Sequence, residues 1–347
     1  MSFVAALLPV VLYIFAVYQI DKFSLVSVKG LVLLVVSGMA AALACFGLFL
    51  LTGPLLTEQQ SAFLDPLVEE AVKALPLLIL ACRKKMVFFI DSVICGAAVG
   101  GGFSILENIF YLLGEPMSMG TVLFRGLEVA LIHMGCSALV AAGLMFAVRL
   151  VERARGRLHV KAGDVLMAIF LLLAAPALHI FHNAFHFPPL FQYLFVFGAM
   201  GGLLWWTHQY DSDMIHRWLD KGLDKQVSLL QSIQEGHLGD TKTGQFLISV
   251  RDSFPAEVFF DIICYVQLYV ELSVASKSRV MMREAGLDEP LEEQQKDMIL
   301  SQYEEFTQLE KRLGKSARIT IAPVVKYYPA DLKSLEDLLA ECRTRHH

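Results

Sequence analysis

The residues with the clearest capacity for chemistry are two adjacent glutamates, Glu69 and Glu70, in an otherwise apolar segment that also carries Lys73. An ionisable side chain inside a membrane costs at least about 2.5 to 3.5 kcal/mol, so such groups usually face a partner or a water-filled cavity. An ion pair between Glu69 and Lys73, spaced i,i+4, would account for two of these charges structurally. This pair would not account for the charge of Glu70, because consecutive residues point roughly 100° apart on a helix.

Polar residues of related types recur in three later apolar segments: Glu107 with Asn108, His133, and His179 with Asn183. His179 and Asn183 are one helical turn apart and therefore share a face. Carboxylates and imidazoles in apolar surroundings suit hydrolysis by an activated water, with a carboxylate as general base and a histidine orienting the water or passing the proton on. An asparagine amide and a neutral imidazole can stabilise the oxyanion that forms.

A metal-dependent version of this chemistry is equally compatible with these residue types. A catalytic zinc ion takes three ligands from His, Glu or Asp and keeps one position for water. The chain has no H-E-x-x-H motif. The sequence therefore leaves open whether a divalent metal such as zinc takes part.

The elements that must position these residues are membrane-spanning helices. The chain has 347 residues, 56% of them hydrophobic, and a mean hydropathy of +0.55, which excludes an ordinary soluble domain. Runs long enough to span a bilayer are predicted at about 2–20, 30–53, 63–82, 87–113, 121–149, 163–185 and 190–208. We therefore expect an all-α polytopic bundle of about seven transmembrane helices in residues 1–208 and a soluble helical domain in residues 209–347.

Lysines and arginines alternate between the predicted loops. The loops after the first, third and fifth runs hold Lys22, Lys29, Arg83, Lys84, Lys85, Arg149, Arg153, Arg155, Arg157 and Lys161, and the loops after the second, fourth and sixth hold none. The positive-inside rule then predicts an outer N-terminus and a cytoplasmic C-terminal domain. With this topology, the six candidate residues Glu69, Glu70, Glu107, His133, His179 and Asn183 fall at similar depths in the outer half of the membrane.

Other polar and small residues have structural explanations. Gly96 and Gly100 are spaced for close helix packing. His182 and His186 are expected at the membrane interface, and Arg125 and Glu128, spaced i,i+3, either pair or receive substrate. In the C-terminal domain, the positions expected in the core are Phe259, Ile262, Ile263, Val266, Leu268, Val270, Met298, Tyr303, Phe306 and Leu309.

Several of these segments resemble the PrsW family of intramembrane proteases, relatives of the CAAX prenyl endopeptidases. The segment from Glu69 to Lys73 is similar to the family's E-E-x-x-K motif, and the glycine-rich run from Gly96 to Glu107-Asn108 is similar to its helix ending in E-N-x-x-Y. His133 and the segment His179–Asn183 correspond to the later H and H-x-x-x-N elements. Gly102 and the residues before Glu107 depart from the usual pattern.

The resemblance implies that Glu69 and Glu70 activate the water and that His133 assists them. It implies an oxyanion-stabilising or metal-binding role for His179 and amide support from Asn183, while Lys73 and Asn108 are supporting residues. The expected protein is an intramembrane endopeptidase of the bacterial inner membrane whose substrate is a membrane-anchored protein. Residues 209–347 are expected to serve a homo-oligomer or a regulatory partner, and no feature predicts nucleic-acid binding.

Two other functional classes use the same features. Buried glutamates and histidines also form the relays of proton-coupled transporters, which inverted repeats would favour, although the two halves show no internal similarity. A non-catalytic scaffold would instead act through the C-terminal helices.

Overall fold

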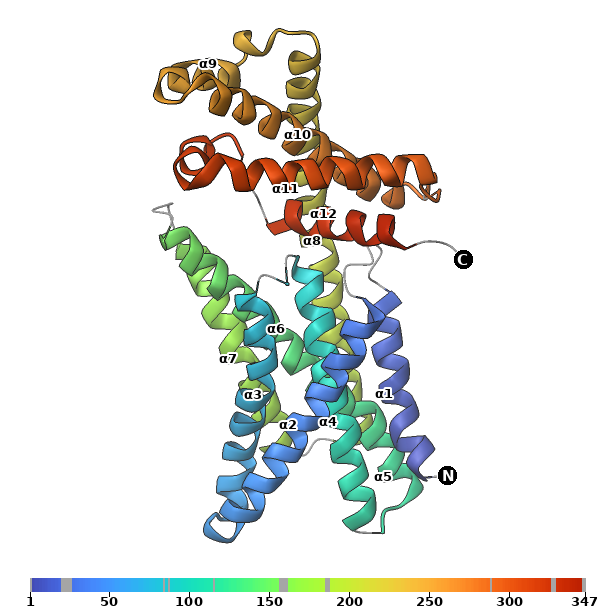
Figure 1. The fold of residues 1–347 in the computed structure, drawn as a ribbon. Coiled ribbons are helices and arrows are strands. Elements are labelled where there is room, and N and C mark those ends of the chain that lie inside the picture. The colour runs from blue at the N-terminus through green and yellow to red at the C-terminus, as the bar shows by residue number, and fades with distance from the viewer. Residues whose placement is uncertain are drawn as a thin grey trace. The chain divides into compact units, whose positions relative to one another are not determined.

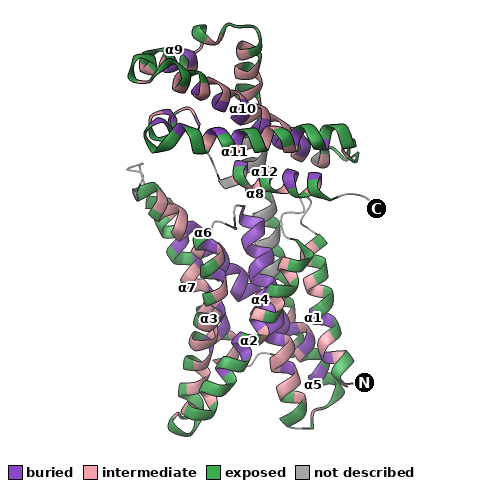
Figure 2. Ribbon diagram, in the orientation of Figure 1, coloured by how far each residue is buried: buried purple, intermediate pink, exposed green. Residues whose placement is uncertain are grey.

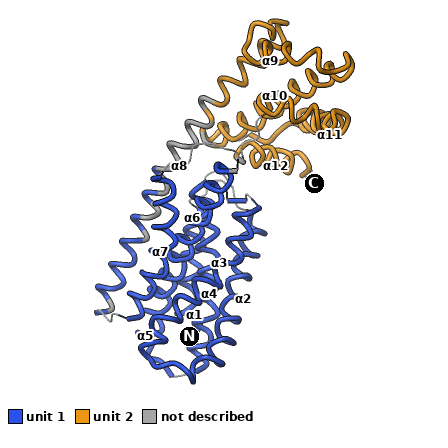
Figure 3. Tube along the Cα trace, turned by 90° about the vertical axis from the view of Figure 1, so that its left-hand side faces the viewer, with its two compact units in different colours: residues 1–211 blue, residues 212–347 orange. Residues whose placement is uncertain are grey.

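The computed structural model is helical and has no β-strand among the residues it describes, which confirms the all-α prediction. These residues are 2–19, 27–83, 85–86, 88–114, 116–155, 162–184, 188–287, 289–325 and 329–344. Five residues named above lie outside the described ranges: Lys22, Lys84, Arg157, Lys161 and His186. The chain divides into two compact units, Met1–Asp211 and Ser212–His347 (Figure 3). The boundary predicted at residue 208 lies three residues before this division.

The helices of the first unit coincide with the seven predicted runs (Figure 1). They are α1 (Ser2–Gln19), α2 (Val28–Thr52), α3 (Glu58–Cys82), α4 (Phe89–Gly114), α5 (Met119–Phe124) continuing through η2 (Arg125–Val129) into α6 (Ala130–Arg155), α7 (Ala162–Ala184) and the first part of α8 (Pro189–Gln234); the short η1 (Gly53–Leu55) follows α2.

Six helical stretches of the described chain are long and apolar enough to cross a membrane. Five belong to the first unit, namely α1, α2, α4, α5 to α6 and α7, and the sixth is α10 (Ala256–Glu284) of the second unit. The protein is thus a polytopic membrane protein, as predicted. Helix α3 is not among the six because its apolar stretch carries four ionisable residues, namely Asp65, Glu69, Glu70 and Lys73.

Helices α4 and α6 form the centre of the first unit (Figure 2). In their apolar stretches 89% of the residues are buried, against 17% in α1. Glycines permit this close packing, because a Cβ atom on Gly96 or Gly100 would lie 2.4 or 2.2 Å from a backbone oxygen of α6. The packing explanation for these two glycines is therefore sufficient.

Local sequence sets the register of the two helices that carry the first acidic residues and His133. Thr57 and Gln60 form a capping box at the start of α3, with the Gln60 amide N–H donating to Thr57 Oγ1 at 3.3 Å and the Thr57 amide N–H donating to the Gln60 side chain at 2.9 Å. Such a cap fixes where a helix begins. Between α5 and α6, the π-helical segment η2 widens the helix just before His133.

The second unit contains the rest of α8, then η3 (Leu238–Asp240), α9 (Lys242–Val250), η4 (Arg251–Ser253), α10, α11 (Glu293–Ile321) and α12 (Pro329–Arg343). Its core includes most of the predicted positions: Ile262, Val266, Leu268, Val270, Phe306 and Leu309 are buried, and Phe259, Ile263 and Tyr303 pack against them. Met298 is 56% exposed, so that prediction was wrong. The adjacent Ile299 is buried instead, because neighbouring helical residues face different directions.

Candidate active site

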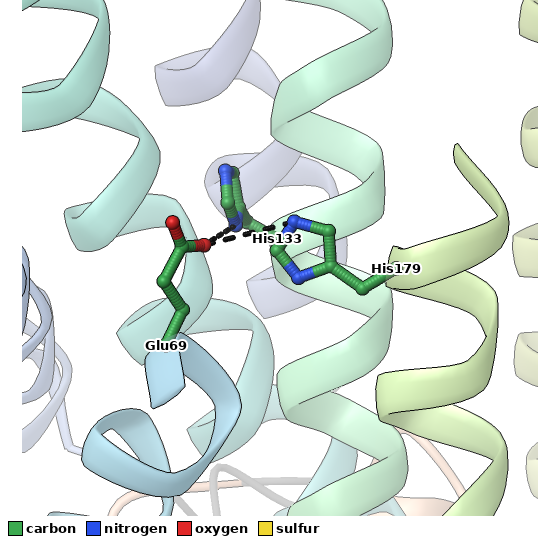
Figure 4. A group of neighbouring side chains, drawn as sticks. All are labelled: Glu69, His133 and His179. Carbon is green, nitrogen blue, oxygen red and sulfur yellow. Dashed lines mark ion pairs between the residues drawn. The ribbon is translucent and has the colours of Figure 1, made fainter. Parts of the chain in front are cut away.

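Four helices of the first unit bring most of the predicted site residues into one cluster. Helix α3 contributes Glu69, Glu70 and Lys73, and Figure 4 shows the Glu69 carboxylate pointing toward the rings of His133 on α6 and His179 on α7. The two imidazole rings lie edge to face, with centroids 4.9 Å apart. Glu107 of α4 reaches the same cluster through His133.

Lys73 pairs with Glu70 rather than with Glu69, contrary to the i,i+4 alternative. The Lys73 ammonium is fully buried and donates to Glu70 Oε1 at 2.6 Å and to His133 Nδ1 at 3.0 Å. It also lies 4.5 Å from the centroid of the Phe103 ring. A buried charge is tolerated where it is paired and hydrogen-bonded. The Glu69 carboxylate is thus the one that takes no part in the ion pair with Lys73.

The hydrogen bonds determine which nitrogen of each histidine carries a proton. A lysine ammonium only donates, so His133 Nδ1 accepts from Lys73, and His133 Nε2–H donates to Glu107 Oε2 at 2.6 Å. An ionised carboxylate only accepts, so His179 Nδ1–H donates to Glu70 Oε1 at 2.9 Å. The lone pair of His179 then lies on Nε2, the nitrogen 3.6 Å from Glu69 Oε2.

One carboxylate oxygen of Glu69 faces both histidines. This Oε2 atom, like Oε2 of Glu70, is buried without a hydrogen-bond partner among the described residues. It lies 3.6 Å from His179 Nε2 and 4.0 Å from His133 Nδ1. One donor atom of each of these three residues lies within 4.8 Å of the other two. Tetrahedral ligands about 2.1 Å from a zinc ion lie about 3.4 Å apart. Small side-chain movements would therefore suffice for these atoms to coordinate a metal.

A cavity of about 1110 Å³ leads to this cluster. Glu69, Glu107, His133 and His179 form part of its wall, together with residues of α2, α5, η2 and α8. Sites for drug-sized ligands typically measure about 300 to 1000 Å³. The cavity thus has room for a segment of polypeptide beside the reactive side chains.

Two further ion pairs in the cavity wall were not predicted. Arg125 donates to Glu107 Oε1 at 3.0 Å and stacks on Tyr111, with the guanidinium carbon 3.6 Å from the ring centroid. Glu128 lies 3.0 Å from His182 Nε2. Arg125 and Glu128 therefore have separate partners, and His182 lines the cavity. The cost of placing charges in an apolar segment was the available signal for these residues.

The two asparagines differ in their relation to the cluster. Asn183 lines the cavity, and its Oδ1 lies 3.1 Å from His182 Nδ1. Asn108 is buried on another side of α4, where its amide donates to the Ala6 carbonyl of α1 at 3.5 Å. The structure therefore places Asn108 outside the cluster, as a contact between helices.

Comparison with known proteins identifies the family. Residues 24–205, more than half of the chain, match the family described as PrsW family intramembrane metalloprotease. The chain belongs to the PrsW family. The PrsW match includes every residue of the cluster from Glu69 to His179 and ends within α8. The protein is therefore an intramembrane protease by family. No curated protein and no solved structure matched the chain in the same comparisons.

Proposed function

We propose that this PrsW-family protein is an endopeptidase that hydrolyses a peptide bond of a membrane-anchored protein, with Glu69 acting directly on the attacking water or on the ion that activates it. The observation that carries this proposal is the Glu69 Oε2 atom, which lacks a hydrogen-bond partner among the described residues and faces two imidazoles at the wall of a large cavity. Neighbouring carboxylates and cations are engaged in hydrogen bonds. Glu69 is thus the carboxylate best placed for chemistry.

The donor set fits a divalent metal such as zinc. Glu69, His133 and His179 would hold the ion, since one carboxylate and two imidazoles are a ligand set used by catalytic zinc. The ion would supply Lewis-acid polarisation of the scissile carbonyl and activation of water. The orphaned Glu69 Oε2 atom supports this assignment, because a bound ion would supply the partner that this buried atom lacks among the described residues.

The remaining residues orient the three donors. Glu70 accepts from His179 Nδ1–H and so directs His179 Nε2 toward Glu69. Glu107 accepts from His133 Nε2–H and so leaves His133 Nδ1 as the acceptor nitrogen. Partners of this kind fix the tautomer and the ring orientation of ligand histidines.

Asn183 serves the developing oxyanion in this proposal. Its Oδ1 faces His182, so the amide N–H₂ group is the end that can donate to a substrate in the cavity. Preorganised donors of this type stabilise the negative charge that builds up on the carbonyl oxygen during peptide hydrolysis.

A metal-free mechanism is the second candidate, and one contact favours it. Lys73 already donates to His133 Nδ1, the atom that would otherwise face an ion. In this mechanism Glu69 is the general base, and His179 orients the water. Both mechanisms place Glu69 on the attacking water or its activator.

The test of the proposal compares Glu69→Gln with Asp65→Asn in purified protein, using a single-span membrane substrate. Asp65 lines the same cavity one helical turn earlier on α3, so its replacement should change the rate little. Glu69→Gln should slow cleavage by roughly 10² to 10⁴-fold. Unchanged cleavage by Glu69→Gln would refute the assignment. Metal analysis and a chelator titration of the same preparation then distinguish the two mechanisms. Removal of zinc should abolish cleavage if the mechanism depends on the metal and should leave it unchanged otherwise.

We further propose that the protein lies in the bacterial inner membrane with its N-terminus outside and residues 209–347 in the cytoplasm. The alternation of Lys and Arg between the loops supports this topology. Cleavage would then occur near the extracytoplasmic side, and the second unit would be available for self-association or a regulatory partner. Reporter fusions after residues 56 and 347 should show opposite locations, and fusions on the same side would contradict the topology.

A further inference from the structure

A second, smaller cavity lies beside the catalytic one. It has a volume of about 120 Å³ and is formed by α6, α7 and the first part of α8. Its wall is almost entirely apolar and includes the buried Cys136 and Val196. Glu69, His133 and His179 do not line this pocket.

The small pocket adjoins the catalytic cavity. Three residues line both spaces: Ile132, His182 and Gln192. Ile132 directly precedes His133, and His182 follows His179 by about one helical turn. A peptide bond at the catalytic cluster would therefore place a neighbouring side chain at the entrance of the pocket.

The size of the pocket selects among apolar occupants. An engineered apolar cavity of about 150 Å³ binds benzene and stays free of water. A pocket of about 120 Å³ therefore accommodates one aliphatic side chain of the size of leucine or methionine. The indole of tryptophan is larger than benzene, so it should fit this pocket less well than a leucine side chain.

We propose that this pocket is a specificity subsite that receives one aliphatic side chain of the substrate, from a residue close to the scissile bond. The inference rests on the proposed endopeptidase function and adds a substrate class to it. Substrates are then membrane-anchored proteins that carry leucine, or a residue of similar size, beside the cleavage site.

The experiment varies the substrate first. In a single-span substrate whose cleavage site is mapped by mass spectrometry, each residue flanking the scissile bond is replaced in turn by Gly, Ala, Leu and Trp. At one flanking position, Leu should exceed Ala in kcat/KM by about 50-fold, as expected for three buried carbon atoms, and Trp should fall below Leu. The other flanking positions should show no such rise.

Two enzyme variants then connect the preference to the pocket. Ala199 and Leu178 both line it. Ala199→Trp fills the pocket and should remove most of the Leu-over-Ala preference while the Gly substrate is cleaved as before. Leu178→Ala enlarges the pocket and should raise the relative rate for the Trp substrate. Ala177→Trp is the control for Ala199→Trp, because Ala177 on α7 is exposed, as Ala199 is on α8, and lines neither cavity.

The outcomes separate this inference from the proposed function. Cleavage that depends on Glu69 but is equal for Ala and Leu at every flanking position would overturn the subsite and leave the protease intact. Equal slowing of all substrates by Ala199→Trp, with Leu178→Ala leaving the preference unchanged, would also overturn it and assign the pocket to lipid or to packing. Cleavage that does not depend on Glu69 would refute the proposed function itself.

Discussion

Replacing Lys73 with methionine should destabilise the protein strongly, because Lys73 is the central cation of the buried cluster. Its ammonium is fully buried and contacts Glu70 at 2.6 Å, His133 at 3.0 Å and the Phe103 ring at 4.5 Å. Methionine retains much of the volume, but among the described residues it leaves the Glu70 charge with only His179 as a donor. Removal of one partner from a buried ion pair costs about 3 to 5 kcal/mol.

A double-mutant cycle tests whether the loss arises from this pair. Glu70→Gln removes the carboxylate charge that Lys73→Met would leave unpaired, so the double variant should be more stable than the sum of the two single losses predicts. We expect a coupling of about 2 to 3 kcal/mol, at the upper end of values for residues in contact. Equilibrium unfolding in mixed detergent micelles measures the free energy of unfolding of all four proteins.

Arg153→Met provides the control for the loss of a cation. Arg153 pairs with Asp164 at 2.5 Å in the same unit, but its side chain is 48% exposed. Exposed ion pairs contribute at most about 1 kcal/mol, so this variant should lose little stability. A loss for Lys73→Met no larger than that for Arg153→Met, or additive losses in the cycle, would show that the buried pair does not stabilise the protein in this way.

Three further predictions concern other parts of the molecule. Gly100→Ala should destabilise the protein by about 1 to 3 kcal/mol, because its Cβ atom would lie 2.2 Å from the backbone of α6. Gly47→Ala, where the new Cβ atom meets no described atom within 4 Å, should not destabilise it. Equal thermal stability of the two variants would contradict the packing argument. Glu107→Gln should weaken the affinity for zinc by about 10 to 100-fold, as measured in a competition titration. Glu58 is exposed and lines the same cavity, so Glu58→Gln should leave the zinc affinity unchanged. Glu341→Gln should destabilise the second unit by about 1.5 to 3 kcal/mol, because Glu341 accepts from two arginines of α10; unchanged hydrogen exchange in that unit would argue against it.

The helices and the gathering of the site residues were accessible from sequence, because both follow from the cost of polar groups in apolar segments. Hydropathy located the seven runs, and the same cost identified Glu69, Glu70, His133 and His179 as residues that need partners. The structure brings these four side chains together. Their catalytic roles stay predictions until activity is measured.

Finer details depended on tertiary packing, which spacing alone does not determine. Lysine at i,i+3 or i,i+4 can pair with either glutamate, and the position of His133 decides in favour of Glu70. Asn108 belongs to the same motif as Glu107 but faces α1. The long apolar helix α10 meets the criteria for a membrane span, yet 44% of its apolar stretch is buried within the second unit.

The wide turn before His133 has a geometric consequence for the wall of the cavity. Arg125 and His133 are eight positions apart, so an uninterrupted α-helix would direct them about 80° from each other. One inserted residue in the π-helical segment reduces this difference to about 20°. Arg125 and His133 can then each donate a hydrogen bond to a different oxygen of the Glu107 carboxylate. A one-residue deletion within η2 would rotate Arg125 away from that carboxylate while leaving the length of the bundle almost unchanged.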